Sequence, residues 1–193
     1  WKGYGGDARQ RALLFNLLLM TLRGSVSLYQ GEELGLEQPI LEFDELVDPY
    51  DIMMYPHHVG RDGCRTPMVW ESATDNGGFS TVKPWLPVRD HHAQLAVDAQ
   101  IAPDSILNLT RAMIHWRKHL PALVQGDIQV VERHDEVVEF TRSHNGETLW
   151  VALNMGQTAV NIQPPAGAQI IREAFLSTDT ESLAPLTGTV WSL

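Results

Sequence analysis

The chain has 193 residues, which is enough for one ordinary domain or for part of a larger protein with a small second domain. Hydrophobic residues make up 44% and charged residues 20%, the balance of a globular protein and not of a disordered one. With 24 acidic and 14 basic residues the formal charge is −10, which excludes nucleic-acid binding as a main role. The single cysteine, Cys64, excludes an internal disulfide, and the longest apolar run (12–22) is too short to cross a bilayer.

The first predicted elements are a helix and a strand. Asp7 is a good N-cap for a helix over residues 8–23, which is rich in strong helix formers and is followed by Gly24. Residues 25–29 are short and β-prone and predict a strand. A helix, a glycine and a strand in this order indicate one step of a layered or barrel α/β fold.

The region from residue 31 to residue 103 shows no sustained hydrophobic period. Irregular regions of this length are uncommon in compact domains and are usually functional or packed across a larger body. A second helix is predicted over residues 106–120, because apolar residues recur there at helical spacing and Pro121 follows.

After Pro121 the chain changes to short β-branched segments separated by turn residues. These segments are 128–131, 137–141, 149–153, 160–162, 170–171 and 189–191. Asn145-Gly146 is a strong signal for a two-residue hairpin turn. The spacing predicts a small antiparallel β-sandwich and a domain boundary near Pro121.

Two carboxylates follow the predicted strand. If residues 25–29 belong to a barrel, Glu32 and Glu33 lie at the end of the strand where such enzymes carry out chemistry. The alternative is that one glutamate only orients a neighbouring loop through hydrogen bonds.

The loop 60–68 (GRDGCRTPM) is a second candidate. Arg61 and Arg65 could bind vicinal hydroxyls or a carboxylate through their planar guanidinium groups. The alternative is an internal pair with Asp62 that holds the loop. We interpret Cys64 as a buried small apolar side chain, because nothing near it in the sequence favours a thiolate.

Histidines and loop aromatics offer weaker signals. The pairs His57-His58 and His91-His92 are sequence neighbours, and the segment of His115 and His119 lacks the glutamate of a metalloprotease helix, so no metal site is expected. No nucleotide-binding or serine-hydrolase motif is present, so no cofactor is expected. The aromatic side chains of loops could stack on sugar rings or fill the underside of a loop. They are Trp70, Phe79 and Trp85.

Three segments carry a family resemblance. Residues 18–35 (LLMTLRGSVSLYQGEELG), 60–68 and 78–88 (GFSTVKPWLPV) closely resemble bacterial α-glucosidases of glycoside hydrolase family 13, the α-amylase family. The helix end at 117–123 (RKHLPAL) is similar to the segment leading into that family's C-terminal domain, and Val69 stands where the family usually has proline.

The resemblance implies an α/β plus all-β architecture. Residues 1–120 would form the end of a catalytic (β/α)8 barrel, with 25–29 as its last strand, flanking helices, and the substrate-side loop region 31–103. Residues 121–193 would form an antiparallel β-sandwich domain.

The resemblance also implies roles for single residues. Arg61 matches the loop arginine that binds hydroxyls of the sugar in the −1 subsite, and Arg65 is a weaker substrate-binding candidate that braces the loop. Glu33 and Tyr29 would support the barrel mouth. The family's catalytic Asp, Glu and Asp would precede Trp1, so none of them is expected in this chain.

The resulting expectation is the C-terminal portion of a retaining α-glucosidase, inactive by itself, cytoplasmic, acting in full length on an oligosaccharide or small α-glucoside. Exposed apolar faces would lead the chain to self-associate. One rival is a non-enzymatic carbohydrate-binding or structural β module. Another is an independent hydrolase that uses Glu32 or Glu33 with Asp62.

Overall fold

The computed structural model describes residues 7–57, 60–131, 136–171, 177 and 179–193. The chain divides into two compact units. We call residues 1–27 and 108–193 the sheet unit and residues 28–107 the loop unit. This division differs from the boundary expected near Pro121, because α1 (Ala8–Thr21) and most of α4 (Ile106–His119) group with the strands.

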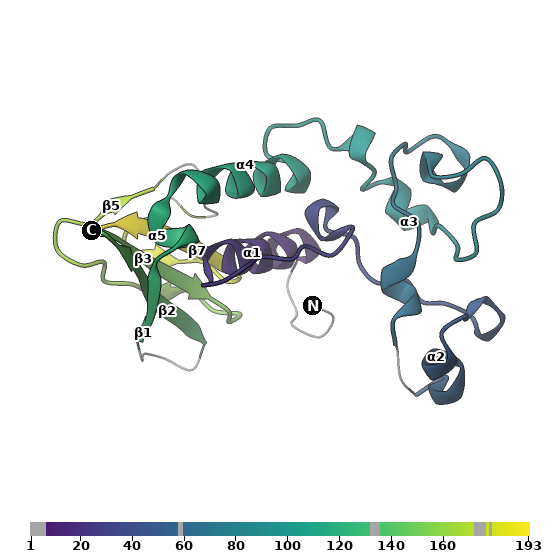
Figure 1. Cartoon of the computed structure of the whole chain (residues 1–193), viewed down its shortest axis with the longest axis horizontal. Coiled ribbons are helices and arrows are strands. Elements are labelled where there is room, and N and C mark those ends of the chain that lie inside the picture. Colours follow the sequence, from purple (N-terminus) through teal and green to yellow (C-terminus); the bar gives the residue numbers. More distant parts are fainter. Residues whose placement is uncertain (1–6, 58–59, 132–135, 172–176, 178) are drawn as a thin grey trace. The chain divides into compact units, whose positions relative to one another are not determined.

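The two long helices of the sheet unit lie side by side (Figure 1). Asp7 caps α1 through its carboxylate, which accepts a hydrogen bond from the backbone N–H of Arg9 at 3.4 Å. Between the helices, the buried Asn16 amide donates to the Thr110 hydroxyl at 3.0 Å. Both predicted helices are confirmed, with ends within two residues of those expected. A short helix, α5 (Pro121–Val124), follows α4.

The strands form two antiparallel sheets. The larger has the order β1-β2-β3-β7-β5, and β4 pairs with β6 in the smaller. Their bounds are β1 Asp127–Val131, β2 Val137–His144, β3 Glu147–Asn154, β4 Val160–Asn161, β5 Gln169–Ile170, β6 Ser182–Leu183 and β7 Thr187–Ser192. Each segment predicted after Pro121 overlaps a strand, whereas β6 was missed because two residues carry no hydrophobic period.

The predicted hairpin turn is confirmed between β2 and β3. Asn145 and Gly146 both have positive φ, 47° and 87°, and His144 pairs with Glu147. These dihedral signs match the right-handed twist of the paired strands.

A buried cluster joins the two sheets. Trp150 and Ala152 of β3 and Trp191 of β7 pack against Ile162 and Leu183, which lie at β4 and β6. The smaller sheet therefore covers one face of the larger one, a two-layer arrangement that buries both tryptophans.

Arg142 on β2 is fully buried and binds only backbone carbonyls among the described residues. Its guanidinium donates to Thr21 O at 2.6 Å, to Leu123 O and Gly126 O at 2.9 Å, and to Asp127 O at 3.3 Å. Burial lowers the pKa of Arg142. The side chain thus satisfies carbonyl groups at the ends of α1 and α5, which have no partner inside their helices.

The loop unit contains short helices and, among its described residues, no strand. The helices are η1 Glu32–Leu34, η2 Phe43–Glu45, α2 Pro49–Met54, η3 Asp62–Arg65, η4 Asp75–Gly78, α3 Asp90–Ala93 and η5 Val97–Ala99. The strand predicted over residues 25–29 is wrong in this structure, because none of these residues belongs to a strand. A strand needs a neighbour with which to exchange hydrogen bonds, and no described segment pairs with 25–29.

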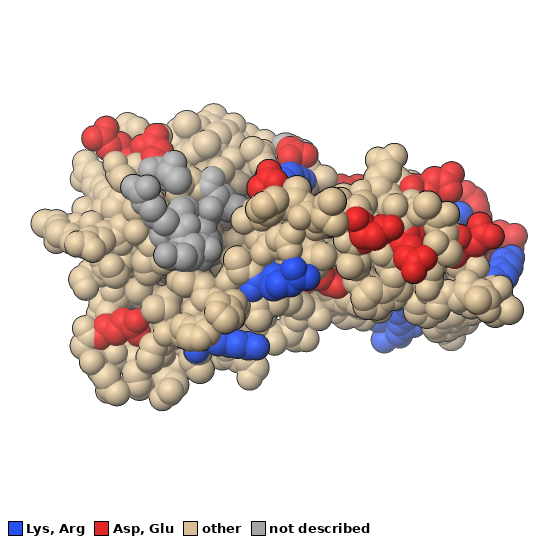
Figure 2. Space-filling view, turned by 90° about the horizontal axis from the view of Figure 1, so that it is seen from above, with Lys and Arg blue, Asp and Glu red and all other residues tan. Residues whose placement is uncertain are grey.

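The surface reflects the acidic composition. The face drawn in Figure 2 carries patches of Asp and Glu and no continuous basic stripe. None of the helices formed by the described residues has the length and apolar character needed to cross a membrane.

Candidate functional site

Asp48 in the loop unit binds both arginines of the loop 60–68. Its Oδ2 atom accepts from Arg61 Nη2 at 2.9 Å, from Arg61 Nε at 3.1 Å and from Arg65 Nη1 at 3.0 Å. Asp48 is also the N-cap of α2, where Oδ1 accepts from Tyr50 N at 2.9 Å and Pro49 occupies the first turn. The Tyr50 N–H, followed by the two guanidinium groups, lowers the pKa of Asp48.

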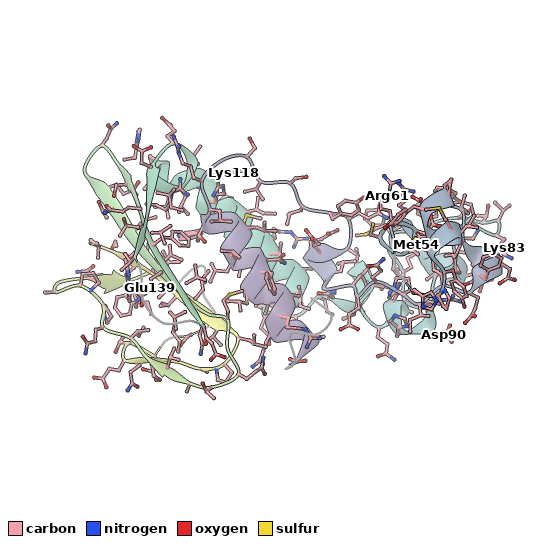
Figure 3. All side chains as sticks on the ribbon, turned by 90° about the horizontal axis from the view of Figure 1, so that it is seen from below. Met54, Arg61, Lys83, Asp90, Lys118 and Glu139 are labelled. Carbon is pink, nitrogen blue, oxygen red and sulfur yellow. The ribbon has the colours of Figure 1, made fainter. Side chains whose placement is uncertain are left out.

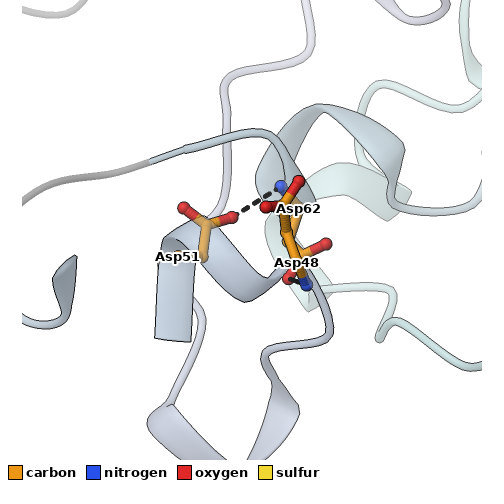
Figure 4. A group of neighbouring side chains, drawn as sticks. All are labelled: Asp48, Asp51 and Asp62. Carbon is orange, nitrogen blue, oxygen red and sulfur yellow. Dashed lines mark hydrogen bonds between the residues drawn. The ribbon is translucent and has the colours of Figure 1, made fainter. Parts of the chain in front are cut away.

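Two further aspartates fix the loop backbone. Asp62 Oδ2 accepts from the N–H groups of Val47 and Asp48 at 2.6 and 2.7 Å, and Asp51 Oδ2 accepts from Asp62 N at 2.9 Å (Figure 4). Asp51 Oδ1 accepts from Gly60 N. The three carboxylates thereby join α2 to η3.

Gly60 is required by this close approach. A Cβ atom at residue 60 would overlap the Asp51 carboxylate. The Gln38 amide donates to Gly60 O at 3.0 Å, and the Gln30 amide donates to Thr66 O at 2.7 Å. Contacts from both sides therefore hold the ends of the loop that carries Arg61.

The two arginines differ in exposure. The Arg61 side chain is 66% exposed, and the Arg65 side chain is 34% exposed. In Figure 3 the labelled Arg61 extends outward from its loop. Asp48 occupies one side of the Arg61 guanidinium, which leaves N–H donors for a ligand that offers hydroxyl or carboxylate oxygens.

Tyr29 and Cys64 lie beside the arginines. Tyr29 is half-exposed, and a hydrogen bond with Cys64 is the main cause of the raised pKa of Tyr29, against the opposing charges of Arg65 and Arg61. Cys64 Sγ also approaches Arg61 O at 3.0 Å. The interpretation of Cys64 as a buried apolar side chain is wrong, because the residue is only half-buried and its sulfur is hydrogen-bonded.

The two glutamates after residue 29 bind their own turn. Glu32 Oε2 accepts from Tyr29 N at 2.9 Å, and Glu33 Oε2 accepts from Gly31 N at 2.8 Å. Both contacts match the alternative that these carboxylates orient a loop. The geometry does not pair Glu33 with Asp62, whose carboxylate is buried and engaged elsewhere.

Asp48, Asp51 and Asp62 form the one group among the described residues whose spacing could suit a metal ion, with ligand atoms within 4.8 Å of one another. Backbone N–H groups and the guanidinium groups occupy these carboxylates. The remaining oxygen, Asp62 Oδ1, faces Arg65 Nη1 at 3.9 Å. Because a cation would compete with fixed positive charge and N–H donors, the donor set does not fit a metal.

The histidines contact one another in pairs. The His91 and His92 rings lie 4.3 Å apart, and the His115 and His119 rings lie 4.4 Å apart. His57 is exposed, and His58 lies outside the described residues. No histidine in the described ranges belongs to a group with metal-site spacing.

The three loop aromatics are exposed to solvent. The exposed fraction is 50% for Trp70, 48% for Phe79 and 64% for Trp85. They do not fill the underside of a loop, which was one of the two expectations. Their ring faces are available to a ligand, and Phe79 lines a pocket.

Sequence reasoning found Arg61, Arg65 and Asp62 but missed Asp48 and Asp51. A local signal for Asp48 exists, since Asp before Pro at the start of a helix is a typical N-cap pattern. No sequence signal connects this cap to arginines that follow 13 and 17 residues later.

Comparison with known proteins identifies similar sequences. The α-amylase catalytic domain family matches residues 3–126, more than half of the chain. A protein named "Probable alpha-glucosidase" from Rhizobium meliloti is 44% identical over 166 residues, covering 86% of this chain and 30% of its own length. An oligo-1,6-glucosidase from Halalkalibacterium halodurans is 31% identical over 187 residues, covering 84% of this chain and 33% of its own.

A solved structure resembles the whole chain. The crystal structure of the alpha-glucosyl transfer enzyme XgtA aligns with a TM-score of 0.89 and 36% sequence identity, covering all of this chain and 37% of that protein. The chain therefore spans about a third of the length of these relatives.

Proposed function

This chain belongs to the α-amylase family of glycoside hydrolases, and from that membership we propose that it is part of a retaining α-glucosidase that releases terminal α-linked glucose from the non-reducing end of its substrate. Within that enzyme, residues 1–120 belong to the end of the barrel and residues 121–193 to a C-terminal β domain. The names of the relatives, α-glucosidase and oligo-1,6-glucosidase, support glucosides as the substrate class.

The observation that carries the proposal is the position of Arg61. Its guanidinium is fixed on one side by the buried Asp48 and is largely exposed on the other. A fixed, planar donor of this kind suits neighbouring hydroxyls of a glucosyl unit. Arg65 is less exposed and binds the same Asp48 oxygen, so its role is to hold the loop. Tyr29 and Glu33 support this region of the barrel mouth.

The 193-residue chain by itself is inactive under this proposal. A retaining glycosidase needs two carboxyl groups about 5 Å apart that flank the scissile bond. The carboxylates of Asp48, Asp51 and Asp62 lie within 4.8 Å of one another, but they are buried and bind N–H groups of their own loop. Glu33 binds its own turn. This arrangement also argues against an independent hydrolase built on Glu32 or Glu33 with Asp62.

Hydrolysis of p-nitrophenyl α-glucoside tests the inactivity. A sample whose intact mass is 21.6 kDa should show no turnover above the buffer blank. Turnover that persists through purification and disappears in Glu33→Gln would contradict the proposal.

The role of Arg61 is tested in a protein of the relatives' length that contains this chain. Arg61→Lys keeps one charge but removes the planar donor set, so we expect kcat/KM to fall at least about 100-fold, in line with lost transition-state contacts. Arg89→Lys is the matched control, because Arg89 also binds a carboxylate, that of Glu45, elsewhere in the loop unit. If Arg61→Lys and Arg89→Lys lowered kcat/KM by the same factor, that result would contradict a contact between Arg61 and the substrate.

A further inference from the structure

The loop unit contains a pocket that is separate from the arginine loop. Its volume is about 660 Å³, within the range of about 300–1,000 Å³ typical of small-molecule sites. No residue of the loop 60–68 lines it. The lining residues are Glu71, Thr74, Asp75, Gly78, Phe79, Ser80 and Thr81.

Backbone hydrogen bonds fix the walls of this pocket. Gly77 O accepts from the N–H groups of both Trp70 and Glu71, at 2.8 and 3.0 Å. The Asn76 amide donates to Ser80 O at 3.1 Å. Asn76 and the two glycines that follow have positive φ, a conformation that folds residues 71–80 back on themselves. The pocket is therefore a preformed feature of the loop.

The lining combines one aromatic face with hydroxyl and carboxylate groups. The Phe79 ring is 48% exposed. Glu71 Oε2 accepts from the Thr74 hydroxyl at 2.6 Å, which holds the carboxylate in one orientation. The Ser80 hydroxyl accepts from Val82 N at 3.1 Å and keeps its own proton for donation. An apolar ring beside oriented acceptors suits a ligand with one C–H face and several hydroxyls.

The charges of the residues that line the pocket indicate which class of ligand it can bind. Glu71 and Asp75 are acidic and the described lining residues include no Lys or Arg, so phosphates and carboxylates are repelled. Neither acidic residue belongs to a group with metal-site spacing among the described residues. A neutral polyhydroxyl ligand remains the best match.

We propose that this pocket is a second saccharide-binding site, in which a glucosyl unit of an α-linked oligosaccharide stacks on Phe79 and donates hydroxyl protons to Glu71. The ligand class rests on the proposed α-glucosidase function. The pocket binds the saccharide without reacting with it, and so holds a longer substrate at a position separate from the Arg61 loop.

The experiment is a titration of the ¹⁵N-labelled 193-residue chain with maltose, followed through backbone amide resonances. We expect saturable shifts at residues 71–81 with a millimolar Kd. Phe79→Ala should weaken this binding about fivefold, since an aromatic contact contributes about 1 kcal/mol and 1.4 kcal/mol corresponds to tenfold. Glu71→Gln keeps the side-chain shape and should weaken it several-fold. Phe43→Ala is the matched control, because Phe43 is 52% exposed in the same unit and does not line the pocket.

The amide resonances of residues 60–66 and those of residues 71–81 distinguish the proposed function of the Arg61 loop from the proposed pocket. Shifts at residues 60–66 without shifts at 71–81 would overturn the pocket and leave the function of the Arg61 loop standing. Shifts at 71–81 that persist unchanged in both Phe79→Ala and Glu71→Gln would also overturn it, as would equal weakening by Phe43→Ala. In each variant, a spectrum that is unchanged away from the substituted residue shows that the chain remains folded.

Discussion

Replacing Arg142 with methionine tests whether the buried guanidinium stabilises the sheet unit. Arg142→Met fills a similar length with apolar atoms but leaves the carbonyl oxygens of Thr21, Leu123, Gly126 and Asp127 without this donor. The variant therefore removes hydrogen bonds that reach from β2 to the ends of two helices.

The expected loss follows from two opposing contributions. Each hydrogen bond from a charged donor contributes about 1.5–3 kcal/mol, whereas burying the guanidinium costs several kcal/mol. A buried carbonyl oxygen left without its donor costs about 1–3 kcal/mol, and because four carbonyls lose this donor we expect a loss of about 3–5 kcal/mol for Arg142→Met. In a chain of this length, that loss corresponds to a decrease in Tm of roughly 6–20 °C.

Urea and thermal unfolding followed by circular dichroism provide the assay. Arg23→Met is the matched control, since Arg23 is 61% exposed and contacts Asp127 at 3.3 Å, so its removal should change the free energy of unfolding by less than about 1 kcal/mol. If Arg142→Met were as stable as Arg23→Met, the carbonyl contacts would not contribute the stability argued here.

Two other predictions concern the loop unit. His92 is buried, its Nε2 atom lies 2.9 Å from Glu37 O, and burial lowers the pKa of His92 in the folded chain. Because the unfolded chain then binds the proton more readily, the free energy of unfolding should fall as the pH drops below about 6.5, and less so in His92→Gln. Urea titrations at pH 8 and pH 5.5 measure this difference, and identical pH slopes for the two chains would refute it. Gly60→Ala should destabilise the chain by roughly 1–3 kcal/mol because its Cβ overlaps Asp51, whereas Gly146→Ala, with open space around it, should cost about 1 kcal/mol from its positive φ alone. Thermal melts compare the two, and a larger loss for Gly146→Ala would contradict the overlap.

The sequence predicted those helices and turns that depend on neighbouring residues in the chain. Asp7 caps α1, Asn145-Gly146 turns the β2–β3 hairpin, and helical spacing identified α4. The strand expected over residues 25–29 failed because pairing depends on neighbours that no single segment encodes. The grouping of α1 with the sheet likewise depends on long-range contacts such as those of Arg142.

The sequence predicted the arginines of the candidate site, but it did not predict which carboxylate pairs with them. Motif and resemblance singled out Arg61, but its carboxylate partner is Asp48 from the start of α2 and not the adjacent Asp62. Asp62 instead accepts backbone N–H groups. Competition among nearby carboxylates for two guanidinium groups is decided by backbone geometry, which the residue order alone does not specify.

The half-buried Cys64 has a practical consequence for studying this loop. It is the one thiol in the chain, and its sulfur lies 3.0 Å from Arg61 O. A thiol-reactive dye therefore labels a single position without any substitution. The rate of that labelling reports how often the hydrogen bond at Cys64 opens, so the native chain carries its own reporter for the movement of the segment that holds Arg61.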